Sequence, residues 1–145
     1  MISKTALHAL HAVLELAQSE EPFVGSAQIA AKIGAPQNYL GKLLQNLARE
    51  GLVHSQKGQG GGFSLTRAPK DITVLDVVES IDHVSRWEGC FMGRESCSAK
   101  NPCPMHHRWV AVRNAYLEML RKTTIEDIAF SKESKESLEA LSNPL

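Results

Sequence analysis

The chain has 145 residues, of which 43% are hydrophobic and 22% charged, a composition typical of a globular domain with a sizeable core. No apolar run approaches the roughly 20 residues that span a bilayer and no charged-then-apolar leader follows Met1, so we expect a cytoplasmic protein without a membrane partner. The formal net charge is zero, but residues 1–70 carry a net +3 and residues 71–145 a net −3. A local basic excess of this kind favours a phosphate-binding face in the first half of the chain.

The chain begins with a predicted amphipathic helix over residues 4–18. Ser3 is a good N-cap for this helix, and leucines recur along it at helical spacing. Its two histidines, His8 and His11, are interpreted as packed or solvated side chains, because a single histidine on a helix is a weak functional signal.

Two further helices follow, joined by a tight turn. Ser26 is expected to cap a short helix that ends at Gly34. Pro36 is expected to start a second helix that Gly51 ends, with an apolar stripe of Leu40, Leu43, Leu44 and Leu47. This pattern predicts a helix-turn-helix, whose second helix enters the major groove of DNA. The alternative is a plain helical hairpin with a solvated polar face. For DNA binding we expect contacts from Ser26, Gln37, Asn38, Tyr39 and Lys42, in which the amides suit adenine edges and Lys42 and the Tyr39 hydroxyl suit phosphates.

A predicted β-hairpin comes next. Residues 52–55 and 63–66 alternate apolar with polar side chains and flank a glycine-rich segment, which indicates a wing. Lys57, Gln59 and Gly60 at its tip are candidate DNA contacts, since glycines let the backbone approach a phosphodiester. The glycines are not followed by a lysine and serine or by a helix, which excludes a nucleotide-binding P-loop.

All three cysteines lie within 14 positions beyond the winged part, and an odd number fits poorly with a disulfide framework. Cys90, Cys97 and Cys103, with His106 one helical turn further on, offer thiolate and imidazole ligands for an iron–sulfur cluster or zinc. The loop alone does not choose the metal. The other interpretation is three unrelated thiols, of which one or two are buried in the core.

The chain around the loop is predicted to be helical. A capping box from Thr73 to Asp76 starts a helix, residues 82–88 form a linker, and a long helix runs over residues 104–122. A second capping box, from Thr124 to Asp127, opens a short C-terminal helix. The long helix carries an apolar stripe of Trp109, Val112, Tyr116, Met119 and Leu120. Pairing with a second copy would bury this stripe, which favours a homodimer; the alternative is that the helix folds back on its own domain.

The predicted fold class is therefore mainly α with a small β-hairpin: a winged helix-turn-helix domain plus a long dimerisation helix. We divide the chain into a winged helix-turn-helix DNA-binding domain (1–82), a cysteine-rich cluster-binding loop (83–103), a dimerisation helix with a short C-terminal helix (104–130) and a polar tail (131–145).

The order of these parts resembles the Rrf-two family of bacterial winged-helix transcription regulators. The resemblance covers roughly residues 1–130 and rests on the residues Ala6-Leu7-His8-Ala9-Leu10, Tyr39-Leu40, Gly51-Leu52-Val53, the wing from Gly58 to Phe63 and the cysteine loop. It implies that the cysteines hold an iron–sulfur cluster, as in the IscR-like and NsrR-like sensors of this family.

The details of the loop decide which branch of the family it is similar to. The segment from Cys103 to Trp109 repeats the IscR-like spacing of cysteine, histidine and tryptophan, which implies His106 as the fourth ligand. The first cysteine gap is one residue longer than usual, which leaves 2Fe–2S, the favoured form, and 4Fe–4S open. Ser3 and Lys4 stand where an NsrR-like protein has an acidic ligand, which counts against that arrangement.

We therefore expect a homodimeric transcriptional regulator that binds a double-stranded DNA operator under the control of an iron–sulfur cluster. A zinc site or a thiol–disulfide switch is the alternative. An enzyme that uses Cys103 with His106 is disfavoured, because the sequence offers no third orienting group. A protein-interaction module built on the long helix is a further alternative, which absence of salt-sensitive DNA affinity would favour.

Overall fold

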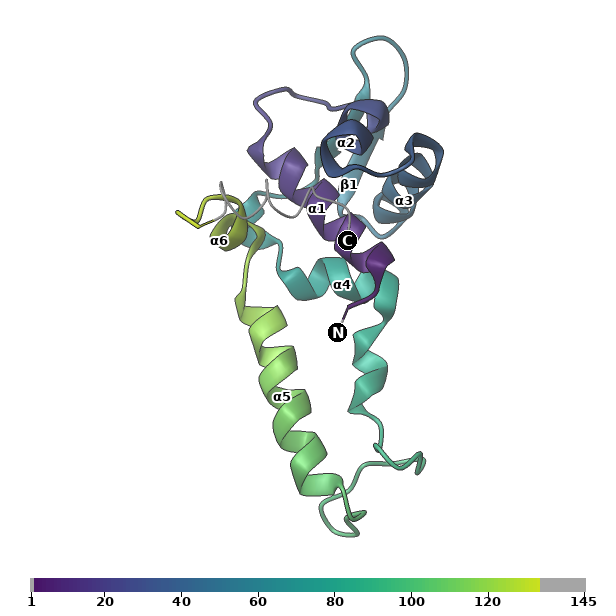
Figure 1. The fold of residues 1–145 in the computed structure, drawn as a ribbon, viewed down its shortest axis with the longest axis vertical. Helices are drawn as coiled ribbons and strands as arrows, with labels where there is room; N and C mark the ends of the chain where they lie inside the picture. Colours follow the sequence, from purple (N-terminus) through teal and green to yellow (C-terminus); the bar gives the residue numbers. More distant parts are fainter. Residues whose placement is uncertain (1, 134–145) are drawn as a thin grey trace.

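The computed structural model describes residues 2–133, which form a winged domain with an elongated arm below it (Figure 1). In chain order the elements are α1 (Lys4–Gln18), α2 (Ser26–Ile33), α3 (Gln37–Arg49), β1 (Val53–Gln56), β2 (Gly62–Leu65), η1 (Pro69–Asp71), α4 (Val74–Asp82), η2 (Val84–Glu88), α5 (His106–Lys122) and α6 (Ile125–Ala129). The predicted fold class, mainly helical with one small antiparallel hairpin, is confirmed. Most of the expected polar tail, residues 134–145, lies outside the described residues. We call residues 83–122 the arm.

Helix α1 is the centre of the winged domain. Ser3 caps it as predicted, accepting a hydrogen bond from the Ala6 backbone N–H at 3.0 Å. Small side chains such as Ala9 and Ala12 are fully buried, so the neighbouring helices approach α1 closely. Helices α2, α3, α4 and α6 all pack on it, and α1 therefore connects α2 and α3 with α4, which leads to the arm.

Helices α2 and α3 form the predicted helix-turn-helix. Gly34 ends α2 with φ 69°, a left-handed conformation that glycine adopts without strain. The prediction of Ser26 as the cap of α2 is wrong by one residue: Gly25 has the extended N-cap conformation and Ser26 is the first helical residue. On α3, the predicted leucine stripe of Leu40, Leu43, Leu44 and Leu47 is buried in the core and leaves the opposite, polar face exposed.

The wing is an antiparallel hairpin in which Val53 pairs with Leu65 and Gln56 with Gly62. The second strand begins one residue earlier than the sequence pattern suggested. Val24, in the segment that leads into α2, forms a β-bridge with Phe63, in which the two residues exchange backbone hydrogen bonds of 2.9 Å. Gly62 makes this bridge sterically feasible, since its φ is 141° and a Cβ there would lie 2.5 Å from the Val24 carbonyl oxygen. The wing is thus fixed to the helix-turn-helix at its base.

The arm leaves the domain through α4 and returns through α5. Both predicted capping boxes, from Thr73 to Asp76 and from Thr124 to Asp127, are present. Thr73 and Thr124 also form an antiparallel bridge, so the residue before α4 lies beside the chain that follows α5. The expected linker over residues 82–88 is instead largely the short helix η2, which follows His83 in a left-handed conformation with φ 50°.

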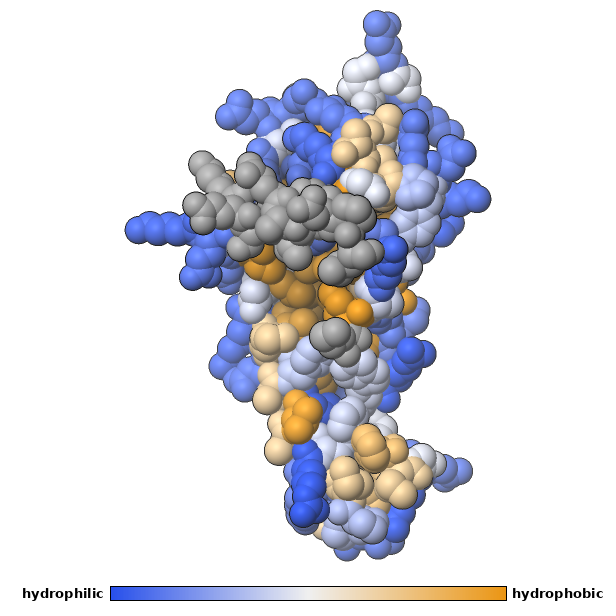
Figure 2. All heavy atoms as spheres, in the orientation of Figure 1, coloured by the Kyte–Doolittle hydropathy of each residue, from blue (hydrophilic) through white to orange (hydrophobic). Residues whose placement is uncertain are grey.

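Helix α5 begins at His106, two residues after the predicted start, and its apolar residues do not form a single exposed stripe. Leu120 and its neighbour Leu117 are buried against α4, so this helix folds back on its own domain in its C-terminal part. Val112 and Met119 remain 64% and 53% exposed. Figure 2 shows apolar surface over the middle of the molecule, where α4 and α5 meet. Within residues 2–133, no helix is long and apolar enough to cross a membrane.

Candidate DNA-binding face and cysteine loop

A groove of about 730 Å³ runs along α3 beside the wing. The predicted contacts Ser26, Gln37, Asn38 and Lys42 all line it, with the ring of Phe63 at its base. Because Phe63 is bridged to Val24, the groove has a fixed width at the base of the wing. The structure therefore brings four of the eight predicted DNA contacts onto one surface.

Gln45 and Arg49 line the same groove and were missed from the sequence. They follow Lys42 at spacings of three and seven residues, so they share its face of α3. Arg49 also donates to the Asn46 side chain at 3.3 Å. The helical spacing and the charge of Arg49 were the available signals for these two residues.

Tyr39, a fifth predicted contact, lies outside this groove. Its side chain is half-buried beside the core, and its hydroxyl lies 3.2 Å from Nδ1 of His8 on α1. The two rings meet edge to face with centroids 5.5 Å apart. The hydroxyl therefore has a partner within the protein, which the sequence did not indicate.

The wing tip carries the remaining predicted contacts, Lys57, Gln59 and Gly60, all exposed and away from the base of the groove. The hairpin requires glycine at position 61, as at position 62, because a Cβ there would lie 2.3 Å from the Gln56 carbonyl oxygen. Gly60 has φ 74° and open space around it, so its role is to turn the exposed tip.

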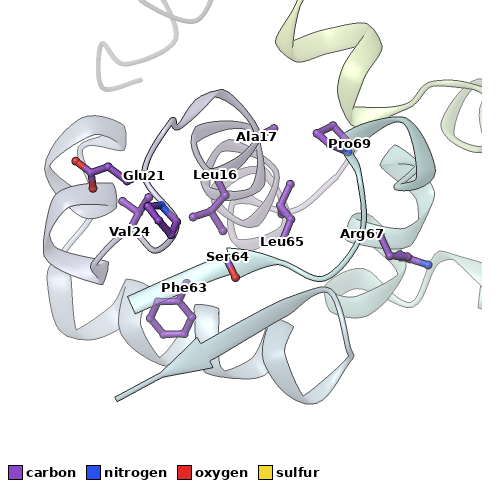
Figure 3. A pocket seen from close by; sticks show the side chains of 10 residues that line it. Leu16, Ala17, Glu21, Val24, Phe63, Ser64, Leu65, Arg67 and Pro69 are labelled. Atoms are coloured by element: carbon purple, nitrogen blue, oxygen red, sulfur yellow. The ribbon is translucent and has the colours of Figure 1, made fainter. Parts of the chain in front are cut away.

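A second, smaller hollow of about 210 Å³ lies on the other side of β2, between the wing and α1 (Figure 3). Its walls include Leu16, Val24 and Leu65, while Glu21 and Arg67 stand at opposite ends with their charged groups pointing outward. Arg67 is paired with Asp76 at 3.7 Å. The hollow between the wing and α1 therefore has mostly apolar side chains in its walls and charged groups at its rim.

The cysteine loop occupies the far end of the arm. Cys97 Sγ lies 3.2 Å from Nδ1 of His106, and the side chains of Cys90 and Cys103 are near enough to interact. Cys103 and His106 are both buried and share one turn, since the His106 N–H donates to the Cys103 carbonyl oxygen at 2.9 Å. All four predicted ligands therefore belong to two neighbouring pairs, which the turn from Cys103 to His106 joins.

Helix α5 holds the chain that leads into this loop. Trp109 Nε1 donates to the Gly89 carbonyl oxygen at 3.0 Å, and Arg113 Nη1 donates to that of Glu88 at 2.9 Å. The Phe91 ring packs on Trp109 with centroids 5.5 Å apart. These contacts fix the position of Cys90 relative to the first turns of α5.

The chemistry of the four donors suits a metal centre, although they do not form a preassembled single-ion site. The Arg94 backbone N–H donates to the Cys90 sulfur and lowers the pKa of this thiol, favouring the thiolate that binds metals. Within residues 2–133, however, no three His, Cys, Asp or Glu side chains are gathered closely enough to hold one ion. Two pairs of ligands are compatible with a group of more than one metal atom, which fits an iron–sulfur cluster by donor type and number.

Comparisons with known proteins find similarity over most of the chain. A sequence model described as "Rrf2: Iron-dependent Transcriptional regulator" matches residues 2–131. An HTH-type transcriptional regulator of Aquifex aeolicus is 34% identical over 88% of this chain and 90% of its own length. The HTH-type transcriptional regulator IscR of Pectobacterium atrosepticum is 32% identical over 87% of this chain and 77% of its own length.

Among solved structures, that of CymR, the global cysteine regulator of B. subtilis, superimposes with a TM-score of 0.72 at 28% identity. It covers 89% of this chain and 95% of the CymR chain. The Aquifex and Pectobacterium relatives are named as transcriptional regulators and CymR as a regulator, and none of the three is named as an enzyme. The helix-turn-helix, the wing and the matched length together establish that this chain belongs to the Rrf2 family of winged-helix transcriptional regulators.

Proposed function

We propose that this regulator binds an iron–sulfur cluster, favoured as 2Fe–2S, through Cys90, Cys97, Cys103 and His106, and that the bound state controls its affinity for an operator. The observation that carries the proposal is the pairing of Cys97 with His106 and of Cys90 with Cys103 at one turn of the loop. When bound, the cluster would supply iron–thiolate and iron–imidazole bonds that hold both pairs together. The similarity to IscR supports this choice of cofactor.

The residues around the loop provide a route from ligand binding to the DNA face. Glu88 and Gly89, just before Cys90, are hydrogen-bonded to α5, while Leu117 and Leu120 hold α5 against α4. Reordering the loop therefore changes the contacts that set the angle between α4 and α5. Helix α4 packs on α1, and α1 packs on α3. Moving the operator from about 1% to about 99% bound requires about 5.5 kcal/mol of differential stabilisation, a value within reach of metal–thiolate binding.

DNA binding itself is proposed to use α3 in the major groove and the wing beside it. Gln37 and Asn38 stand at the start of α3, where amide side chains reach base edges. Lys42, Arg49 and the wing's Lys57 supply charge for phosphates. A second copy of the chain would place two such faces on successive turns of DNA.

The homodimer is proposed to form through α5. Val112 and Met119 lie seven residues apart on one face of this helix and are largely exposed, and pairing with the same face of a second copy would remove them from water. Substituting Val112 by Asp should convert a dimer to a monomer in sedimentation equilibrium, whereas Asn114→Asp, on an exposed position of the same helix, should not. Equal masses for the two variants would contradict a dimer that forms through this face of α5.

The cluster is tested by anaerobic purification followed by a visible spectrum with iron and sulfide analysis. Wild type is expected to be brown, with equal iron and acid-labile sulfide. His106→Ala should lose or shift the visible bands, while His107→Ala, the exposed neighbour whose ring contacts His106, should retain them. A wild type without iron and sulfide would contradict the proposal.

A zinc site or a thiol switch is the second candidate. Two observations support it: the described residues form no preassembled metal site, and the chain is similar to CymR. Stoichiometric zinc in a colourless protein would support the zinc site. Loss of free thiols on oxidation, with a change in DNA affinity, would support the thiol switch. The prediction of a cytoplasmic location stays a prediction.

A further inference from the structure

The contact between His8 and Tyr39 has no part in the function proposed above. His8 lies on α1, and Tyr39 lies in the first turn of α3, the turn that also carries Gln37 and Asn38. The two side chains are 31 positions apart in the chain, and the 3.2 Å separation of Nδ1 and the hydroxyl is a hydrogen-bonding distance. This bond links the central helix of the domain to the start of the recognition helix.

The position of Tyr39 indicates which part of DNA it meets. Gln37, Asn38 and Lys42 line the groove between α3 and the wing, whereas Tyr39 does not. Its half-buried ring packs on the core at the flank of α3 nearest α1. A hydroxyl at the flank of a helix in the major groove faces the sugar–phosphate backbone rather than base edges.

We propose that His8 is a positioning residue for DNA binding, which holds the Tyr39 hydroxyl so that its single hydrogen points to a backbone phosphate. This inference rests on the proposed docking of α3 in DNA. A phosphate accepts hydrogen bonds but cannot donate them, so the hydroxyl must donate to it. The bond with His8 must then run the other way, from Nδ1–H to the hydroxyl oxygen. DNA binding therefore selects the histidine forms that carry a proton on Nδ1.

The charges near His8 determine how this selection depends on pH. Lys4 lies one turn before it on α1, His11 one turn after it, and Tyr39 faces it from α3; Glu15 acts on His11 and is itself paired with Lys32 of α2 at 3.2 Å. Burial, followed by the charge of Lys4, lowers the pKa of His8 in the free protein. A DNA phosphate reached through Tyr39 has the opposite effect, because its negative charge favours the imidazolium.

It follows that DNA binding is accompanied by proton uptake at His8, and affinity rises as pH falls through the histidine range. A purely structural ring contact would not produce this behaviour. It would leave the pH dependence of DNA affinity unchanged.

The test uses the full chain and a fluorescein-labelled mixed-sequence duplex of about 30 base pairs at low salt, because phosphate contacts do not depend on sequence. Anisotropy gives the dissociation constant from pH 8 to pH 6 for wild type and three variants. Tyr39→Phe removes the hydroxyl and keeps the ring. His8→Phe keeps a ring beside Tyr39 and removes the hydrogen bond, whereas His8→Asn places an amide nitrogen at the level of Nδ1 but cannot titrate.

His8→Phe and Tyr39→Phe are each expected to weaken binding by about 3- to 10-fold, the range for one net hydrogen bond, and the double variant should bind like Tyr39→Phe alone. His8→Asn should bind nearly as wild type does at pH 8, without the gain on the order of 3-fold that wild type shows towards pH 6. Lys42→Gln serves as a matched control. Lys42→Gln should reduce the salt dependence of binding, whereas Tyr39→Phe should not, because Tyr39 carries no charge.

Two results would overturn the inference while the proposed function stands: His8→Phe binding within 2-fold of wild type, or His8→Asn retaining the wild-type pH profile. A wild-type chain that does not bind the duplex at any pH overturns the docking proposal and this inference together. Thermal unfolding of each variant identifies loss of fold, and if His8→Phe does not fold, the pH profile of His8→Asn decides by itself.

Discussion

The recognition helix and the cysteine loop lie in different parts of the molecule and are held by different kinds of contact (Figure 1). Helix α3 rests on a continuous core, in which Leu40, Leu44 and Leu47 are fully buried. The cysteine loop instead depends on a few hydrogen bonds to α5, and its Phe91 and Met92 are more than half exposed. The proposed DNA-binding face is therefore preformed, whereas the loop has few contacts that would resist rearrangement if its four candidate ligands bound the proposed cluster.

The sharpest test of this difference is one apolar truncation in each region. Leu44→Ala removes a fully buried side chain of α3 and should lower the free energy of unfolding by about 3 kcal/mol. Met92→Ala, at a side chain 58% exposed in the loop, should change it by less than about 0.5 kcal/mol. Urea denaturation followed by circular dichroism measures both, and equal losses would contradict the comparison.

The wing allows the same comparison at the level of the backbone. Gly62→Ala places a Cβ against the Val24 carbonyl at a φ of 141° and should destabilise the domain by about 1–3 kcal/mol. Gly25→Ala is the control, since Gly25 has an ordinary extended φ of −69° and no atom within 4 Å of the added carbon. Its cost should be smaller, about 0.5–1 kcal/mol, because alanine is a poorer N-cap than glycine. A Gly62→Ala variant as stable as wild type would show that the wing is not fixed at its base.

On the arm, the expected effect is local. Arg113→Gln removes the hydrogen bond from α5 to the Glu88 carbonyl and should raise the rate of tryptic cleavage after Arg94 and Lys100 about 3-fold. The midpoint of urea unfolding should stay unchanged. Arg108→Gln, at an exposed position on the same helix, is the control and should leave both measurements as in wild type. A shifted midpoint would show that the loop and the core unfold together.

The smallest effect is expected at α6, where the chain returns from the arm to the domain. The Thr124 backbone N–H donates to Asp127 at 2.9 Å and lowers the pKa of this carboxyl. A lowered pKa contributes stability above the ordinary value of about 4, and this contribution is lost as pH falls through the folded value. The stability difference between wild type and Asp127→Asn should therefore be present at pH 7 and should shrink as the pH falls below the ordinary pKa of the carboxyl and through its lowered folded value. A difference that stays constant over this range would contradict the assignment.

Local patterns in the sequence were sufficient for most elements of the fold. Ser3 and the two capping boxes marked helix starts because capping depends on residues three apart. The leucine spacing of α3 predicted which face is buried, and the glycines between two alternating segments predicted the wing. Position 26 was misassigned as a cap, since Gly25 can take the extended N-cap conformation as readily as serine.

The sequence by itself therefore determined the helix-turn-helix, the wing and the identity of the candidate ligands, because these depend on neighbours along the chain. Only the tertiary structure decided which distant residues meet. It placed Leu117 and Leu120 against α4, paired Cys97 with His106, and brought His8 to Tyr39 across 31 positions. Such contacts depend on how helices pack around the small side chains of α1, and no local spacing in the sequence specifies that arrangement.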